Sequence, residues 1–278
     1  MAVETLGVDL SSSAGIAVNG DALADWADDT AVTWVELEAS TPVTFGGFLV
    51  KVGTASTKNE RGVIKIATGA AGSEVEIVRL PSRLLERAGP VSVFVPVAIP
   101  SGSRVSVAAA NSGGFSRVIQ VIGYPESEIG AAPFSVMDVG PFRSGAQADY
   151  ARGVEVIAAA TAHTKGAWTE VSQDTAVNRI SGDALPHDYD HLGLMFLSAS
   201  NPIASAVLVD LAVGPAGSEV IIAENLGFNE FAGSGSAPSW PSILWISASV
   251  IPSGSRISAR IQCSEASRAI ELLLAGVR

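Results

Sequence analysis

The chain has 278 residues and a formal net charge of −11 at pH 7; 47% of its residues are hydrophobic and only 16% are charged. An acidic chain without clustered Lys and Arg binds phosphate groups poorly, so we expect no nucleic-acid partner. The mean hydropathy is high, +0.36. However, no run of about 18 or more apolar residues occurs, which excludes a membrane-spanning helix. The length suits two domains of ordinary size.

Three short motifs occur twice in the sequence, in the same order. They are a W-x-E motif, an A-G-S-E motif and an I-P-S-G-S-R motif. The W-x-E motif lies in the matching stretches 34–37 and 168–171, and A-G-S-E begins the stretches 71–78 and 216–223. The I-P-S-G-S-R motif occupies 99–104 and 251–256. An ordered set of repeats indicates a duplicated module and not chance similarity. We therefore expect both halves to have the same fold, with Ser73 equivalent to Ser218 and Arg104 equivalent to Arg256.

Strand patterns follow one another along each copy. Residues 15–18 and 153–156 predict the first strand of each module. Alternating apolar runs bounded by Gly, Pro and Ser predict about seven or eight strands per module. The last strands are predicted at 117–124 and 269–277. Only residues 82–89 favour a short helix, because charged residues flank a pair of leucines before a Gly.

These patterns predict an all-β protein with two tandem antiparallel β-sandwich domains of the jelly-roll type. A jelly roll pairs short strands in two sheets and protects most sheet edges. We place the first module with its N-terminal arm at 1–125, a Pro-containing connection at 126–152, and the second module at 153–278. The second copy is longer near 176–191 and 224–241, where Gly, Pro, Ser and Asp predict surface loops.

A cluster of polar residues, H-D-Y-D-H, lies in the first of these insertions. Its members are His187, Asp188, Tyr189, Asp190 and His191. A metal site normally needs three or four ligands, and no further ligand cluster is visible, so we expect no metal. Two interpretations remain open: a solvated loop, or a loop that recognises sugars through its Tyr and carboxylates. In the second insertion Trp240 is the candidate for an exposed aromatic contact, the alternative being packing beneath that loop.

Each copy also carries a tryptophan and an acid–base pair at equivalent positions. These residues are Trp34, Glu74 and Arg104 in the first copy and Trp168, Glu219 and Arg256 in the second. A tryptophan shared by both copies predicts packing. The carboxylates of glycoside hydrolysis act as two acids, and not as an acid and a base. The Glu–Arg pairs therefore predict a structural ion pair or a turn brace.

Sequence motifs of catalysis are absent: there is no nucleophile elbow, no Walker loop and no dinucleotide-binding glycine motif after a strand. Only His163, His187 and His191 could serve as imidazole acids or bases. Cys263 is the only cysteine, which excludes an intrachain disulfide, and we expect it in a strand without chemistry. We expect no enzymatic activity, no catalytic residue and no cofactor.

The repeated stretches resemble a β-sandwich module of virion structural proteins from tailed bacteriophages and gene transfer agents. The stretches are "GAAGSEVEIV…VFVPVAIPSGSRVSV" and "VGPAGSEVIIA…WISASVIPSGSRISARIQ", each preceded by W-x-E, and the resemblance covers residues 30–124 and 160–278. It implies a non-enzymatic spike, decoration or tail-fibre subunit located in the virion. Its partners would be other virion proteins and a host-surface polysaccharide. The alternatives are a free carbohydrate-binding lectin and a glycan-degrading enzyme.

Two predicted strands, 63–67 and 270–277, are apolar at successive positions and so on both faces. The outer face of a sandwich normally contacts water, so a doubly apolar strand needs a second cover. We therefore predict a homo-oligomer in which a neighbouring subunit supplies this cover. The resemblance favours a trimer, with a fivefold assembly as the alternative at a capsid vertex.

Overall fold

The computed structural model describes residues 7–11, 15–19, 21–22, 32–54, 62–81, 91–111, 116–129, 137–140, 154–172, 185, 187–197, 205–230 and 243–278. The chain forms two compact units. Unit 1 is Met1–Met137 with Val277–Arg278, and unit 2 is Asp138–Gly276. The division falls inside the connection predicted at 126–152. The helix predicted at 82–89 lies outside the described residues.

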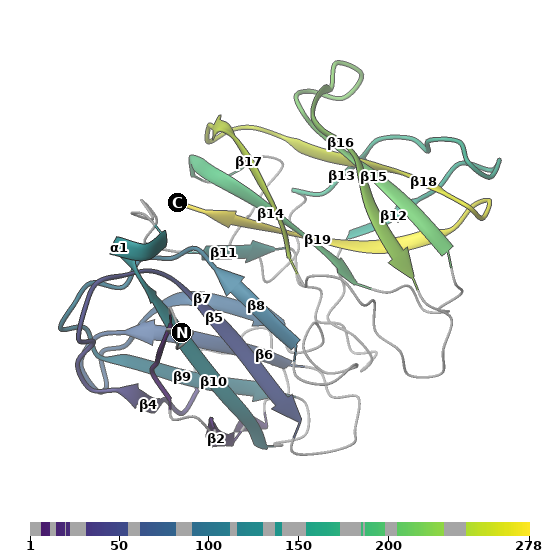
Figure 1. Ribbon diagram of the computed structural model, residues 1–278. Coiled ribbons are helices and arrows are strands. Elements are labelled where there is room, and N and C mark those ends of the chain that lie inside the picture. Colours follow the sequence, from purple (N-terminus) through teal and green to yellow (C-terminus); the bar gives the residue numbers. More distant parts are fainter. Residues whose placement is uncertain are drawn as a thin grey trace, which may run out of the picture. The chain divides into compact units, whose positions relative to one another are not determined.

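Unit 1 consists of two sheets (Figure 1). The first has the order β1-β10-β5-β8, with β2 also paired to β10; its strands are β1 (Val8–Asp9), β2 (Ile16–Asn19), β5 (Phe45–Thr54), β8 (Val91–Val95) and β10 (Ser116–Pro125). The second has the order β3-β9-β6-β7, with β4 also on β9; its strands are β3 (Asp21–Ala22), β4 (Val35–Glu38), β6 (Gly62–Thr68), β7 (Val75–Pro81) and β9 (Val105–Asn111). A short helix, α1 (Glu126–Ile129), follows β10.

Unit 2 also has two sheets. The first has the order β11-β19-β14-β17, with β12 also on β19; its strands are β11 (Met137–Gly140), β12 (Val154–Ile157), β14 (Tyr189–Leu197), β17 (Leu244–Ile251) and β19 (Ala269–Val277). The second has the order β13-β18-β15-β16; its strands are β13 (Thr169–Glu170), β15 (Ser205–Val213), β16 (Val220–Glu230) and β18 (Ile257–Cys263). Strand β11 lies within the segment predicted as a plain connection.

The strand order is that of a jelly roll in both units. Eight strands of each unit, numbered in chain order, pair as 1-8-3-6 in one sheet and 2-7-4-5 in the other. In unit 1 the first and last of the eight are β2 and β10, and in unit 2 they are β12 and β19. The predicted fold class and the shared strand order of the two halves are therefore confirmed. Among the described residues, no helix has the length and apolar character needed to cross a membrane.

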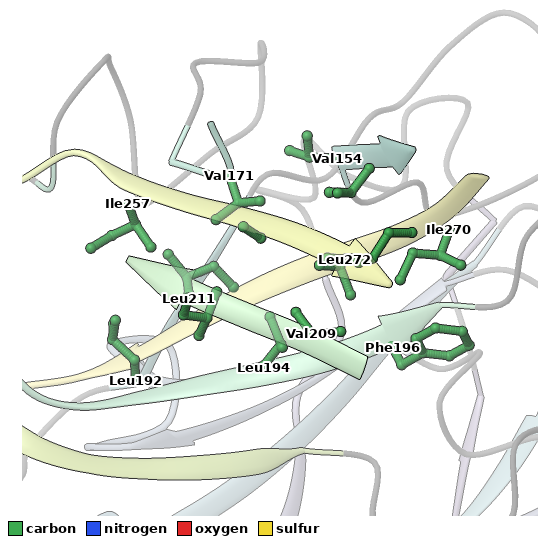
Figure 2. Packing of buried hydrophobic residues seen from close by; sticks show 14 of the residues in the cluster. Val154, Val171, Leu192, Leu194, Phe196, Val209, Leu211, Ile257, Ile270 and Leu272 are labelled. Carbon is green, nitrogen blue, oxygen red and sulfur yellow. The ribbon is translucent and has the colours of Figure 1, made fainter. Parts of the chain in front are cut away.

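The core of unit 2 lies between its two sheets. Figure 2 shows Leu192 and Leu194 of β14 near Val209 and Leu211 of β15, with β18 and β19 contributing further apolar side chains. Alternation along β18 places Ile257, Ala259, Ile261 and Cys263 in this core. Cys263 is a buried free thiol in a strand, as expected.

Two insertions predicted as surface loops are partly strand. Strand β14 begins at Tyr189, and β16 continues to Glu230, where it pairs with Ser205 of β15. These parts of the loop prediction are wrong, because polar residues are tolerated in a strand when they face away from the core or lie on an edge. Residues 176–184, Pro186 and residues 231–241, which include Trp240, lie outside the described residues.

The two strands predicted to be apolar on both faces have buried residues at successive positions. In β6, residues 63–67 are all buried, Lys65 included. In β19, Leu273, Ala275 and Val277 are fully buried although they alternate with Leu272 and Leu274 of the core. Cover by a neighbouring subunit and the oligomeric state both stay predictions.

Two equivalent serines test how a buried hydroxyl affects stability. The Oγ atoms of Ser106 in β9 and Ser258 in β18 are buried and have no hydrogen-bond partner among the described residues. Replacing either with Ala removes a desolvated polar group, so the free energy of unfolding is expected to stay within about 0.5 kcal/mol or to rise. Ser172→Ala is the contrasting variant, because its Oγ accepts from the N–H of Ile257 at 3.1 Å, and it is expected to lose about 1 kcal/mol. Urea unfolding measures all three, and a loss for Ser258→Ala as large as for Ser172→Ala would contradict the expectation.

Candidate functional site

The residues of the H-D-Y-D-H cluster do not form one exposed site. His187 and Asp188 are exposed, whereas the Tyr189 side chain is 0% exposed and belongs to the core of unit 2. A Cβ added at Gly276 of β19 would lie 2.4 Å from the Tyr189 ring, which shows how closely the ring packs on that strand. The prediction that Tyr189 lies on a ligand-facing loop is wrong, because the alternation of β14 directs this position inward.

Asp188 has a structural contact within unit 2. Its Oδ1 accepts a hydrogen bond from the N–H of Ser253 at 2.7 Å, which holds the I-P-S-G-S-R turn against the start of β14. Asp190 and His191 are partly buried in β14. Within the part of the chain that the structure describes, no group of three or more His, Cys, Asp or Glu is arranged to hold a metal ion.

The equivalent Glu–Arg pairs come together as predicted, and each has a second carboxylate. In unit 1 the Arg104 cluster consists of Arg104, Glu36 and Glu74. The Nε of Arg104 lies 2.7 Å from Glu36 Oε2, and its Nη1 lies 3.0 Å from Glu74 Oε1. The same Nη1 donates to the carbonyl of Gly69 at 3.2 Å. One guanidinium thus ties β4, the turn before β7 and the start of β9 to one another.

Unit 2 repeats this arrangement atom for atom. The Arg256 cluster consists of Arg256, Glu170 and Glu219. The Nε of Arg256 lies 2.8 Å from Glu170 Oε2, and its Nη1 lies 3.4 Å from Glu219 Oε1. Its Nη1 also donates to the carbonyl of Gly214 at 3.3 Å. The interpretation of the Glu–Arg pairs as structural braces fits this geometry.

Glu36 and Glu170 were not predicted as members of these clusters, although the repeated motifs contain them. They are the acidic residues of the two W-x-E motifs. The three repeated motifs, W-x-E, A-G-S-E and I-P-S-G-S-R, therefore each supply one member of the same three-residue cluster. Their retention in both copies follows from this joint role in bracing one end of the sandwich.

The carboxyl groups of Glu74 and Glu219 are stabilised in their charged form. Burial alone would raise the pKa of Glu74, but hydrogen bonds from its own N–H, from Arg104 and from the N–H of Gly72 lower it below its ordinary value of 4.5. For Glu219 the pKa is lowered by its own N–H, against an opposing effect of burial, and further by the N–H of Gly217 and by Arg256.

These shifts predict acid sensitivity. A carboxyl group whose pKa is lower in the folded state stabilises the fold fully above its unfolded pKa, and this contribution is lost as the pH falls through the folded value. We therefore expect the urea midpoint of the wild type to fall as the pH is lowered below about 4.5, the ordinary pKa of these groups. Glu74→Gln and Glu219→Gln are each expected to lower the midpoint at pH 7 and to make its pH dependence shallower. If the variant that combines Glu74→Gln with Glu219→Gln showed the same slope of urea midpoint against pH as the wild type, this assignment would be contradicted.

Unit 2 carries a further ion cluster on the outer face of β15 and β18. The Asp210 carboxylate is 1% exposed. Its Oδ2 lies 2.6 Å from Lys165 Nζ and 2.8 Å from Arg260 Nε, and its Oδ1 accepts from the N–H of Asn225 at 2.9 Å. Lys165 also reaches the exposed Glu224 at 2.9 Å. The Asp210 cluster thus places one buried carboxylate between two cations.

Trp168 packs against this cluster. The guanidinium carbon of Arg260 lies 4.4 Å from the centre of the Trp168 ring, within cation–π range. The packing role predicted for this repeated tryptophan is consistent with the contact. In unit 1 the position equivalent to Asp210 is Lys65, which pairs with Glu76 at 3.2 Å, so the buried charge there has the opposite sign.

The chemistry available to the described clusters is limited. A general acid in glycoside hydrolysis needs a carboxyl group with a raised pKa. Burial raises the pKa of Asp210, but Lys165, the N–H of Asn225 and Arg260 together lower it below 3.8. The carboxyl groups of Asp210, Glu74 and Glu219 are therefore all held in the charged form by ion pairs. The ion pairs of these clusters brace sheets and turns.

Comparison with known proteins gave structural likenesses only. No protein-family model matches the chain, and no curated protein sequence matches it. A chain of the Cowpea mosaic virus top component, naturally occurring empty particles, aligns with 12% identity over 98% of this chain and 95% of that chain, at a TM-score of 0.31. A structure of infectious bursal disease virus strain Gx aligns with 12% identity over 86% and 58%, at 0.18. Vicilin from Solanum melongena aligns with 13% identity over 88% and 74%, at 0.17. At such scores the jelly-roll assignment rests on the strand order of the chain itself.

Proposed function

We propose that this protein is a non-enzymatic structural component of a virus particle, built from two tandem jelly-roll modules. The specific role we favour is a head-spike, decoration or tail-fibre subunit of a tailed bacteriophage, as the sequence resemblance implies. Its partners would be other copies of itself and other virion proteins.

This proposal rests on where the repeated residues lie in the fold. All three motifs retained in both copies meet in the Arg104 and Arg256 clusters, which brace one end of each sandwich. The module has the same bracing residues in both copies, and the lowered pKa values of Glu74, Glu219 and Asp210 keep these carboxylates charged. Such a module is suited to a mechanical and not a chemical role. The paired carboxylates also argue against the glycan-degrading enzyme.

The test is mass spectrometry of purified particles from cells that produce this chain. We expect peptides of the chain to co-purify with particles through a density gradient at a fixed stoichiometry to the main capsid protein. Recovery of the chain only in the soluble fraction would overturn the proposal.

Attachment to a host-surface polysaccharide is a separate part of the proposal. Of the predicted contact residues, exposed His187 and Asp188 remain available in the described part of unit 2, while buried Tyr189 does not. Binding of the isolated chain to a glycan array, reduced by His187→Ala, would support attachment. Strong glycan binding by a chain that is absent from particles would instead favour a free lectin.

A further inference from the structure

One outer sheet face of unit 1 carries aromatic side chains. In β5 the even-numbered residues from 48 to 52 are fully buried, so Leu49 and Lys51 face outward. The adjacent strands β8 and β10 place Phe94 and Ile122 on either side of Leu49 (Figure 1). We define the aromatic face of unit 1 by six outward-facing residues of these three strands, which are Leu49, Lys51, Phe94, Gln120, Ile122 and Tyr124.

A glycine lets the two rings of this face lie close to the sheet. Gly47 has no side chain, and a Cβ added there would lie 2.7 Å from Cζ of Phe94, so the Phe94 ring lies over this position. The rings of Phe94 and Tyr124 meet edge to face, with their centroids 6.1 Å apart. Phe94 is 38% exposed and Tyr124 is half-buried. The centre of the face is therefore a low aromatic surface that a flat apolar group can contact.

Polar groups lie at one end of the aromatic face. Lys51 of β5 and Gln120 of β10 are direct partners in the strand register. Gln120 donates from Nε2 to Asp9 Oδ2 at 2.8 Å, and Oδ1 of Asp9 accepts from Ser11. Both oxygens of Asp9, which lies in β1 on the far side of β10 from Lys51, are thus engaged. The ammonium group of Lys51 has no ion pair or hydrogen bond among the described residues, so it can receive an anionic group.

The polar groups at this place are particular to unit 1. In each unit an aromatic ring at the start of the third of the eight strands packs on a glycine of the last strand, and this contact aligns the two units. By that alignment Met195 is equivalent to Lys51, and Leu273 is equivalent to Gln120. Met195 and Leu273 are 0% exposed, whereas Lys51 and Gln120 are half-buried. The module therefore folds without polar groups at these positions, and folding alone does not explain them in unit 1.

Size and charge indicate which occupant suits the aromatic face. It spans about 13 Å along β5 and about 10 Å across the three strands. Each partner of a stable protein interface buries about 800 Å², so the face by itself is too small for a second copy. A nucleic acid needs clustered cations, which a chain of net charge −11 does not supply here. A saccharide offers a C–H face to the rings and hydroxyls to the polar end, and the carboxylate of an acidic sugar needs one cation, Lys51.

We propose that the aromatic face of unit 1 binds a saccharide that contains uronic acid sugars. One sugar ring packs on Phe94 and Tyr124, the carboxylate of the saccharide pairs with Lys51, and the amide oxygen of Gln120 accepts from a hydroxyl. This inference rests on the attachment part of the proposed function, for which it supplies a site in unit 1 and a class of polysaccharide.

The experiment is isothermal titration calorimetry of the full-length chain with tetrasaccharides of polygalacturonate, polymannuronate and hyaluronan, each as the acid and as its methyl ester. We expect at least one acid to bind. For that acid, Phe94→Ala is expected to raise the Kd at least about tenfold. Lys51→Gln is expected to raise it about two- to fivefold, the usual range for an exposed ion pair, and the methyl ester should weaken binding to the wild type equally. The control is Ile157→Ala, a 49% exposed apolar position on β12, which should leave the Kd unchanged. Circular dichroism melting checks folding, and Phe94→Leu replaces Phe94→Ala if that variant is unfolded.

Each outcome decides the proposal. Absence of binding to all three acids would overturn it, as would equal Kd values for acid and ester, or binding that Phe94→Ala and Lys51→Gln leave intact. If sedimentation velocity showed that Phe94→Ala abolishes self-association while no saccharide binds, the face would be assigned to a second copy and the proposal rejected. Particle mass spectrometry separates this result from the proposed function. Saccharide binding by a chain absent from particles would retain the inference and reject the virion role, and a chain found in particles that binds none of the acids would do the reverse.

Discussion

Replacing Tyr189 with Ala is expected to lower the free energy of unfolding by about 3–5 kcal/mol, the usual range for removing a large aromatic side chain from a core. Tyr189 is 0% exposed and is among the largest fully buried side chains of the chain. Its ring fills the space above Gly276 of β19, where even a Cβ would be too close. The cavity left by the truncation cannot close easily, because the strands on either side are fixed by their ladders.

His187→Ala is the matched control for this variant. His187 is exposed, and its ring packs edge to face with that of Tyr189, with the centroids 6.4 Å apart. We expect its unfolding free energy to stay within about 0.5 kcal/mol of the wild type. Chemical denaturation followed by far-ultraviolet circular dichroism measures both. An unchanged stability for Tyr189→Ala would mean that the ring lies outside the core, and the original interpretation as a ligand-binding residue would regain support.

Replacing Asp210 with Ala is expected to lower the free energy of unfolding by about 3 kcal/mol. Removing one member of a buried ion pair generally costs about 3–5 kcal/mol, because the partner charge is left uncompensated. The lower end applies here, since the Lys165 and Arg260 side chains are each 24% exposed and can turn partly toward solvent. Asp210→Ala also removes the acceptor for the N–H of Asn225 in the neighbouring strand β16.

Two further variants separate the contributions to this effect. Asp210→Asn keeps an oxygen acceptor for Asn225 but removes the charge, so its loss is expected to be smaller than that of Asp210→Ala. Glu224→Ala removes the exposed partner of Lys165, whose side chain is 55% exposed, and is expected to cost at most about 1 kcal/mol. Urea midpoints at neutral pH give the ranking. Equal losses of unfolding free energy for Asp210→Ala and Glu224→Ala would show that the burial of Asp210 does not increase its contribution to stability.

The sequence by itself determined the duplication and the all-β class. The strand class is a local feature, because alternation along a strand is visible within a few residues, and the duplication follows from the ordered motifs of the two halves. The pairing of Glu74 with Arg104 was also predictable, because both residues recur in order in the second copy. At Tyr189 the local sequence was misleading. Its polar neighbours are typical of a loop, but the residue begins strand β14.

Only the tertiary structure decided which faces are covered and which distant groups meet. Glu36 is 68 residues from Arg104, and Glu170 is 86 residues from Arg256, so no local pattern could assign either carboxylate to its cluster. Alternation shows that successive residues of β6 and β19 face opposite ways, but it cannot show whether the outer face is already buried within the chain. The Asp210 cluster also depends on tertiary contacts. Arg260 comes from β18 and Lys165 from the segment before β13, and the strand pairing of the jelly roll brings both to Asp210 on one sheet face. Burial and ion pairing depend on contacts across the sheets, and these exist only once the chain has folded.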